Sequence, residues 1–309
     1  MSVALEVRVS AARMLTPVVR EFTLQACTGP LPGFSPGSHV QVHLPLTKGK
    51  VRNAYSLTSD PADNRHYRIA VRLQEASRGG SHYLHRHVQI GDTLQISPPA
   101  NLFALHSTAG LHILIAGGIG ITPFMAYIAA LEQSQAPFEL HYLYRPGLSD
   151  AYVEELQQRL GSRLHTYACR PDLNHILRDR PMGSHVYTCG PQPLLDAVRH
   201  QASVLGWPPG RVHWEAFSAA KPGQPFDLEL LRSGRRLRVG GEQSLLEALE
   251  SAGLQIPNLC RGGVCGQCMT RHVGGKIEHR DSFLSPAEQA EFLMPCVSRG
   301  CGPCVSLDL

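Results

Sequence analysis

The chain has 309 residues, of which 43% are hydrophobic and 17% are charged, and its formal net charge is +4. This composition is enough for two or three globular domains, and the mild charge does not favour a nucleic-acid-binding protein. The apolar stretch 111–131 has the length of a membrane span, but three glycines and a proline interrupt it. A strand, a turn and a helix fit this stretch better. Because the first ten residues alternate like a strand rather than a signal peptide, we expect a soluble cytoplasmic protein.

The first third of the chain consists of short alternating segments that Gly, Pro and Asp turns separate. This pattern predicts a small antiparallel β-barrel with one short helix over 82–88. The predicted strands are 3–9, 19–25, 38–44, 67–73 and 92–98.

The pattern changes near residue 107. The continuous apolar run 110–118 is typical of a buried parallel strand, and a helix is expected from Pro123. Strand and helix patterns then alternate as far as the helical segment 193–206. Such a βαβ series predicts an open parallel sheet that binds its ligand at the carboxyl ends of the strands.

The last third begins after a Pro/Gly-containing linker, which we place at 219–225. A hairpin is expected first, and then a short helix that Ser244 and Glu247 open with a capping box. A second capping box, Ser285 with Glu288, predicts another helix before a final strand. The expected domains are therefore 1–106, 107–218 and 226–309.

The last domain contains six of the nine cysteines within 45 residues, which in a reducing compartment favours metal ligation over disulfides. Cys260, Cys265 and Cys268 form a glycine-rich C-x4-C-x2-C loop. A plant-type iron–sulfur cluster uses this spacing and one distant cysteine, for which Cys296 is the first available. Buried free thiols or a zinc site are the alternatives, although zinc loops usually pair two C-x2-C knuckles.

The same spacing recurs from Cys296 to Cys304. Two clusters would need about eight thiolates, and this region holds only six cysteines. Spacing alone leaves Cys301 or Cys304 open as the fourth ligand. Since both run into the final strand, where successive side chains alternate between faces, we interpret them as thiols that bind no metal.

Two segments of the α/β domain are candidates for a nucleotide site. The segment 116–123, "AGGIGITP", follows a strand and opens a helix, which suits a backbone that cradles a pyrophosphate. The segment 188–191, "TCGP", ends another strand. Both should face one ligand at the carboxyl edge of the sheet. Taken alone, Cys189 is more typical of a buried small residue than of a nucleotide site.

In the barrel, we expect Gly79, Gly80 and Ser81 to enter the short helix, where they would offer N–H groups and a hydroxyl, and Arg78 would add charge. Such a turn can bind a phosphate, although an ordinary glycine turn is the simpler interpretation of these residues alone. Residue propensities alone predict no particular structure or function for the segment 52–57, "RNAYSL".

Taken in order, the motifs "RNAYSL", "GGS", "GGIGITP", "TCGP", "HWEAF" and "CRGGVCGQC…C" give the whole chain a resemblance. The chain is similar to the phthalate dioxygenase reductase family, which includes the vanillate O-demethylase reductases. The resemblance implies an FMN-binding barrel at 1–106, an NADH-binding α/β domain at 107–218 and a β-grasp plant-type ferredoxin domain at 226–309.

The resemblance also implies roles for individual residues. Tyr55 and Ser56 would lie along the isoalloxazine, Thr122 would approach it from the nucleotide side, and Cys189 would lie beside the nicotinamide. Ser56, Thr122 and Cys189 are therefore the expected catalytic residues. The other expected FMN-binding residues are Arg52, Leu57, Arg72, Gly80, Ser81 and Phe217, and the other NADH-binding residues are Gly117, Gly118, Gly120, Arg145, Gly190 and Pro191.

The implied activity is the transfer of a hydride from NADH to FMN, and of single electrons through a 2Fe-2S cluster to a Rieske-type oxygenase or O-demethylase acting on an aromatic acid. A monomer is expected. Arg145 leaves NADPH open, because an arginine at this position can accommodate its 2′-phosphate. Cys301 and Cys304 depart from the family pattern. A reductase for another acceptor, such as a hydroxylase, and a redox-sensing protein without catalysis are the alternatives.

Overall fold

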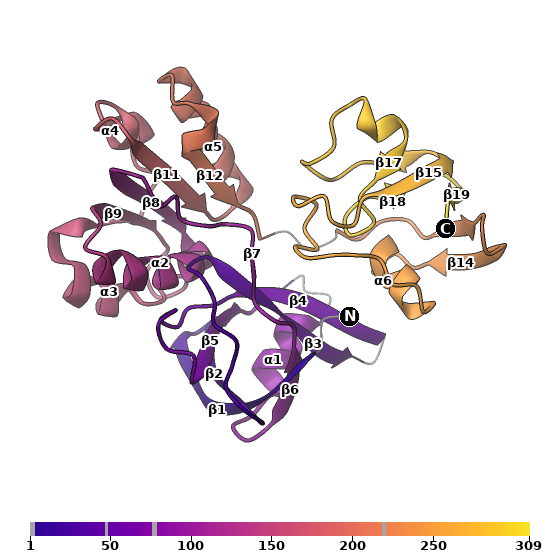
Figure 1. The fold of residues 1–309 in the computed structure, drawn as a ribbon, viewed down its shortest axis with the longest axis horizontal. Helices are drawn as coiled ribbons and strands as arrows, with labels where there is room; N and C mark the ends of the chain where they lie inside the picture. Colours follow the sequence, from indigo (N-terminus) through magenta and orange to yellow (C-terminus); the bar gives the residue numbers. More distant parts are fainter. Residues whose placement is uncertain (1–3, 47–48, 76–78, 218–220) are drawn as a thin grey trace. The chain divides into compact units, whose positions relative to one another are not determined.

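A computed structural model describes residues 4–46, 49–75, 79–217 and 221–309. The chain forms two compact units, each built from two stretches of sequence (Figure 1). The first unit is Met1–Leu44 with Arg52–Phe217, and the second is Pro45–Val51 with Ser218–Leu309. The predicted barrel and α/β sheet therefore share one unit, and the cysteine-rich region forms most of the other.

The barrel of the first unit is an antiparallel sheet in the order β4-β3-β6-β1-β2-β5, with β7 paired to β3. Directly after β4, Leu57 forms an antiparallel bridge with Ile69 of β5, which links the two ends of this order. The predicted helix is α1 (Gly80–Arg86). The strands are β1 (Leu5–Thr16), β2 (Val19–Ala26), β3 (Ser38–Leu46), β4 (Gly49–Ser56), β5 (His66–Arg72), β6 (Thr93–Ile96) and β7 (Ala100–Asn101).

The α/β part is a parallel sheet in the order β10-β9-β8-β11-β12, as the βαβ pattern predicts. The chain leaves β8 in one direction through β9 and β10 and returns on the other side with β11, so the strand order reverses between β8 and β11. The strands are β8 (Leu111–Gly117), β9 (Phe138–Leu143), β10 (Leu164–Tyr167), β11 (Ser184–Cys189) and β12 (Val212–Glu215). The α-helices are α2 (Thr122–Gln133), α3 (Val153–Leu160), α4 (Leu173–Leu177) and α5 (Gln192–Val204), and the 3-10 turns are η1 (Gly118–Ile121), η2 (Gly161–Arg163) and η3 (Pro209–Arg211).

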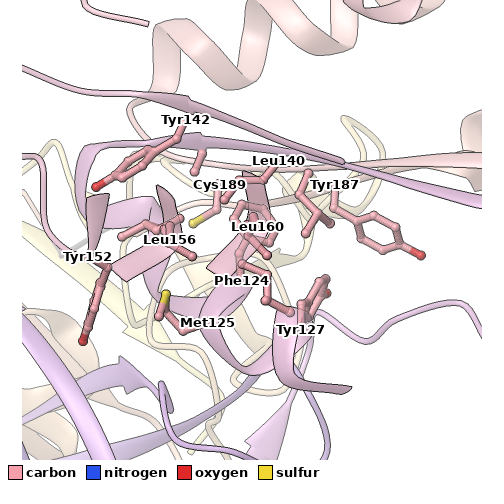
Figure 2. Packing of buried hydrophobic residues seen from close by; sticks show 14 of the residues in the cluster. Phe124, Met125, Tyr127, Leu140, Tyr142, Tyr152, Leu156, Leu160, Tyr187 and Cys189 are labelled. Carbon is pink, nitrogen blue, oxygen red and sulfur yellow. The ribbon is translucent and has the colours of Figure 1, made fainter. Parts of the chain in front are cut away.

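One hydrophobic core joins the barrel to the parallel sheet. It packs Val19 of β2 and Ala70 of β5 in the same cluster as Ile121 and Phe124 of the nucleotide part. Figure 2 shows the labelled side chains of this cluster, with Cys189 among the aromatic rings. Because apolar burial is the main stabilising contribution to folding, the two parts stabilise one another.

The second unit has a mixed sheet in the order β14-β13-β19-β15-β17 and a separate pair, β16 with β18. The predicted capping box is present, since Ser244 and Glu247 exchange hydrogen bonds at the start of α6 (Leu245–Ser251). The strands are β13 (Phe226–Leu230), β14 (Arg235–Val239), β15 (Thr270–Gly274), β16 (Ile277–Glu278), β17 (Phe292–Leu293), β18 (Arg299–Gly300) and β19 (Cys304–Leu307).

The second predicted capping box leads to no α-helix. Ser285 N–H does donate to Glu288 Oε2 at 2.8 Å, but only the 3-10 turn η4 (Glu288–Ala290) follows. Strand β17 begins at Phe292, so the chain must extend before a second helical turn can form. The helix prediction at this position was wrong because pairing with β15 determines the local backbone.

Candidate flavin, nucleotide and iron–sulfur sites

The two predicted nucleotide motifs meet at the reversal of strand order. Cys189, the last residue of β11, pairs with Ala116 of β8. The backbones that follow are so close that a Cβ on Gly120 would lie 2.2 Å from the Cys189 carbonyl oxygen. A Cβ on Gly117 would lie 2.8 Å from Pro191 Cδ and 3.5 Å from Gly190 Cα. Glycine at these positions is therefore a steric requirement of the crevice.

Cys189 is fully buried in the shared core. Burial raises the pKa of its thiol well above the usual value, and the nearby Glu215 carboxylate adds to this shift. The side chain is therefore a neutral thiol rather than a thiolate nucleophile. Beside it, Thr188 Oγ1 is buried without a hydrogen-bond partner among the described residues.

The flavin motif and the nucleotide loop lie against the same barrel strand. Leu57 is bridged to Ile69 of β5, and η1 also contacts β5. Ser56 and Thr122 are 5% and 2% exposed, and the Thr122 hydroxyl donates to the Ile119 carbonyl at 2.9 Å. The structure thus brings the segments of two predicted catalytic residues, Ser56 and Thr122, to one strand.

The predicted phosphate turn packs on the flavin motif. A Cβ on Gly80 would lie 2.1 Å from Asn53 Nδ2, and this amide donates to the Tyr55 hydroxyl at 3.2 Å. Burial raises the pKa of Tyr55 to about 12, although the Asn53 hydrogen bond acts in the opposite direction. The buried Ser81 Oγ accepts from Gln74 N–H at 3.1 Å. Arg78, which we expected to add charge, lies outside the described residues.

Other predicted residues lie at the edges of these segments. Arg52 and Arg145 are exposed, Arg72 is half-buried at the end of β5, and Phe217 is 46% exposed after β12. The backbone of Arg145 connects it to the nucleotide loop through Ser149. Its N–H donates to Ser149 Oγ at 2.9 Å, and a Cβ on Gly118 would lie 3.5 Å from Ser149 Cβ.

In the second unit, four thiols converge. The sulfur atoms of Cys268 and Cys296 lie 3.3 Å apart although 28 residues separate them in the chain. Cys260 and Cys265 form the second hydrogen-bonded pair, and Cys260 also interacts electrostatically with Cys268 and Cys296. The Cys260 thiol lowers the pKa of Cys265 to about 6, against the effect of burial.

The backbone around these thiols supplies N–H groups and requires glycine. Gly262 N–H donates to Cys260 Sγ at 3.3 Å. Gly263 and Gly266 have φ of 76° and 75°, and a Cβ on Gly266 would lie 2.3 Å from the Phe283 ring. Four thiols with N–H donors are the donor set of a plant-type 2Fe-2S centre, and these residues fit that group.

Cys301 and Cys304 lie in a different environment. Cys301 is exposed, and its N–H donates to the Lys276 carbonyl at 2.8 Å. Cys304 begins β19, where its sulfur lies 3.7 Å from the Val305 carbonyl oxygen and its charge interaction is with Arg236.

Three residues that the sequence analysis did not select also belong to these sites. Asn53 joins the flavin motif to the phosphate turn, and Ser149 joins Gly118 to Arg145. Glu215 pairs with Cys189 in the parallel register of β11 and β12. Of these three residues, only Glu215 could have been selected from the sequence, because it lies in the "HWEAF" motif that ends the strand beside "TCGP".

The protein-family models that match this chain cover the barrel, the nucleotide domain and the cysteine-rich domain separately. The family model described as "2Fe-2S iron-sulfur cluster binding domain" matches residues 228–305, and the "Oxidoreductase FAD-binding domain" matches 6–104. A third, "Dimethylamine monooxygenase subunit DmmA-like, N-terminal domain", matches 93–212. The solved structure of phthalate dioxygenase reductase aligns with a TM-score of 0.90 and 32% identity, over 99% of this chain and 98% of that chain.

Curated relatives match along the full length. The heme-dependent oxidative N-demethylase beta subunit of Ectopseudomonas mendocina (strain ymp) is 62% identical, with 100% of both chains covered. The carnitine monooxygenase reductase subunit of Escherichia coli (strain K12) is 43% identical, with 98% of both covered. The chain belongs to the phthalate dioxygenase reductase family. This reductase is an NAD(P)H-dependent flavin and iron–sulfur oxidoreductase that transfers electrons to an oxygenase, and its fold class is confirmed.

No helix in the described ranges of the reductase combines the length and the apolar character that a membrane span requires.

Proposed function

We propose that this reductase oxidises NADH and delivers single electrons to the oxygenase component of an amine N-demethylating system. It would use FMN in the barrel at 1–106, NADH in the domain at 107–218 and a 2Fe-2S cluster in the domain at 226–309, beyond the linker at 219–225. A bound flavin supplies the exchange between two-electron hydride chemistry and one-electron transfer. We further propose a monomer that works in the cytoplasm.

The convergence of four thiols is the observation that carries this proposal. Cys260, Cys265, Cys268 and Cys296 would hold the cluster, since these thiols already interact through hydrogen bonds and charge. The N–H group of Gly262 favours the negative charge of a thiolate and would favour the more reduced cluster. Cys301 and Cys304 would bind no metal.

In the first unit, the residues would act mainly by position. Gly117, Gly118 and Gly120 would let the backbone N–H groups approach the pyrophosphate, with Gly190 and Pro191 closing the other side. Cys189 would pack beside the nicotinamide as a neutral thiol, because burial keeps its proton in place. Its small side chain would leave room for the ring while excluding water from that side.

On the flavin side, Ser56 and Thr122 would present hydroxyl groups to the isoalloxazine, and Tyr55 and Leu57 would pack along it. Ser81 Oγ already accepts a hydrogen bond, so its proton is available to the FMN phosphate beside Gly80. Arg52 and Arg72 would neutralise phosphate charge, and Phe217 would shield the flavin. Arg145 would contact the ribose end of NADH.

The N-demethylase acceptor is favoured by two comparisons. The 62% identical relative is named as a subunit of a heme-dependent oxidative N-demethylase, and residues 93–212 match a dimethylamine monooxygenase family. A Rieske-type oxygenase acting on an aromatic acid is the second candidate, which the 0.90 TM-score with phthalate dioxygenase reductase favours.

Anaerobic stopped-flow mixing with each acceptor tests the assignment. The NADH-reduced protein is mixed with a haem-containing N-demethylase subunit or with a Rieske-type oxygenase, and acceptor reduction is followed by absorbance. We expect saturable reduction of the haem protein and at least tenfold slower reduction of the other, a difference that corresponds to roughly 1.4 kcal/mol or more. The reverse order would establish the Rieske-type acceptor instead.

Cofactor identity is a separate measurement. Chromatography of the flavin released by heat should show FMN rather than FAD, and steady-state kinetics should give a higher kcat/KM with NADH than with NADPH. Sedimentation of the holoprotein should give a monomer. A flavin that NADH and NADPH both leave oxidised would contradict the enzymatic function itself.

A further inference from the structure

A group of three potential metal ligands lies on the sheet of the nucleotide domain. Glu139 and His141 are two residues apart on β9, so their side chains leave the same face of the sheet. His165 of β10 is the parallel partner of His141 and therefore shares that face. One ligand atom from each of the three residues lies within 4.8 Å of the others. Strand pairing alone thus places two imidazoles and a carboxylate around one point.

The group is more ordered than a chance surface cluster. His141 is 3% exposed, and its ring stacks on His165 with centroids 4.8 Å apart and an interplanar angle of 14°. His141 Nδ1 lies 2.9 Å from the Tyr167 hydroxyl, and His141 Nε2 lies 2.9 Å from Glu139 Oε1. A metal-binding histidine typically has its second ring nitrogen held by such a partner, which fixes the tautomer and aims the other nitrogen at the metal.

We propose that Glu139, His141 and His165 form a binding site for a divalent transition cation of the zinc class. Two imidazole nitrogens and one carboxylate oxygen are a common set of three protein ligands for such an ion, with water in the fourth position. His165 is exposed, so ions can enter from solvent and the fourth position stays accessible.

Arg180 would compete with a cation for the Glu139 carboxylate. Its Nη2 lies 2.7 Å from Glu139 Oε1 and its Nη1 lies 3.3 Å from Glu139 Oε2. A cation that binds Glu139 must share the carboxylate with this guanidinium, so Arg180 weakens the site without filling it. Replacement of Arg180 should therefore strengthen cation binding. If the ion pair were purely structural, its loss would destabilise this region and would not strengthen cation binding.

The bound ion would join two strands. β10 lies at the end of the sheet and pairs only with β9 among the described strands, so a shared ion would fasten this edge strand to its neighbour. Glu139 and His165 are each the second residue of their strands, away from the carboxyl ends that form the nucleotide crevice. The site is therefore independent of the proposed electron transfer.

Zinc titration of the intact holoprotein tests the proposal. Protein equilibrated with micromolar Zn²⁺ is analysed for bound metal, and its thermal midpoint is measured with and without the ion. We expect wild type to bind one more Zn²⁺ per chain than His165→Ala and to gain thermal stability that His165→Ala does not gain. His200→Ala, which removes another exposed histidine of the same domain, should behave as wild type.

Two further variants sharpen the test. Arg180→Gln should bind Zn²⁺ more tightly than wild type, and Tyr167→Phe should bind it about 10–100-fold more weakly because His141 loses its orienting partner. Equal zinc content in wild type and His165→Ala would overturn the proposal, as would unchanged or weaker binding in Arg180→Gln. His165 is exposed, so its replacement should leave the fold intact, and exposed thiols contribute equally to every variant.

Discussion

The iron–sulfur region and the nucleotide crevice show opposite ways of building a redox site. Around Cys260, Cys265, Cys268 and Cys296, the chemistry is in the side chains, and the backbone serves to bring four sulfur atoms together. In the crevice, the chemistry is in the backbone, since Gly120 lies so close to the Cys189 carbonyl that no side chain fits between them. The iron–sulfur site should therefore be sensitive to the loss of a sulfur atom, and the nucleotide crevice to the addition of a carbon atom.

The largest expected effect is the loss of one sulfur. Cys296→Ser should abolish the 2Fe-2S absorbance and the NADH-dependent reduction of cytochrome c, because a hydroxyl replaces a thiolate ligand. Reduction of the flavin by NADH should remain. The matched controls are Cys301→Ser and Cys304→Ser, which should keep wild-type absorbance. Loss of iron from either control would show that the ligand set is assigned incorrectly.

The next largest effect is the addition of one carbon. Gly120→Ala places a Cβ where the Cys189 carbonyl oxygen lies 2.2 Å away, so the backbone of the crevice must shift. We expect the rate of flavin reduction by NADH to fall by about a hundredfold, as for an ångström-scale misplacement of reacting groups. The iron–sulfur absorbance should not change.

Gly210→Ala is the control, because a Cβ there meets nothing within 4 Å and its φ is not positive. Wild-type rates for Gly120→Ala would mean that the crevice tolerates added volume and that its backbone is not the critical element.

A third effect concerns acid. His112 and His185, at the amino ends of β8 and β11, are buried, and burial lowers the pKa of each to about 4, with nearby positive groups adding to the shift. Unfolded histidines bind protons below about pH 6.5, so the unfolded state is favoured progressively as the pH falls from 6.5 to 4. The groups that act on these two rings include His106, His213 and Arg211.

The thermal midpoint of the first unit should therefore fall between pH 6.5 and pH 4. His112→Phe keeps an aromatic ring without a titrating group and should fall less steeply over this interval. His200→Phe, which replaces an exposed histidine, should keep the wild-type slope. A slope in His112→Phe equal to that of wild type would show that the buried rings do not control acid stability.

The smallest expected effect is the loss of one hydrogen bond. The Tyr152 hydroxyl donates to Glu21 Oε2 at 2.6 Å, and Glu21 is 4% exposed. Tyr152→Phe should lower the free energy of unfolding by about 1–3 kcal/mol, because a buried carboxylate loses a donor. Chemical denaturation measures this change. Tyr144→Phe is the control, and equal losses in the two variants would show that the effect is not specific to the hydrogen bond between Tyr152 and Glu21.

The sequence indicates the cluster loop well because its three cysteines lie within nine residues and their spacing is specific to one kind of centre. Spacing alone does not select the fourth cysteine, since Cys296, Cys301 and Cys304 lie close together in the chain, and the choice of Cys296 depended on the expected final strand. The turn before β18 brings Cys296 to Cys268, whereas Cys301 lies in the bend between β18 and β19 and Cys304 begins β19.

The crevice is harder to predict for a physical reason. A glycine is required when another strand lies against it, and the neighbour of Gly120 is 69 residues away in the chain. Asn53 and Ser149 were not predicted for the same reason, because their close approaches to Gly80 and Gly118 depend on tertiary proximity. The failed helix after Ser285 shows the reverse case, in which a valid local signal yields to strand pairing.

The core shared by the barrel and the parallel sheet has a consequence for how such proteins can be recombined. Val19 and Ala70 pack with Ile121 and Phe124, so a cut near residue 106 would expose apolar surface on both fragments. Such fragments should aggregate when they are expressed separately. A cut at 221–225 divides no part of this core, because none of its buried residues lies in 221–309. Exchange of electron-carrying modules between oxygenase systems is therefore easiest at that junction.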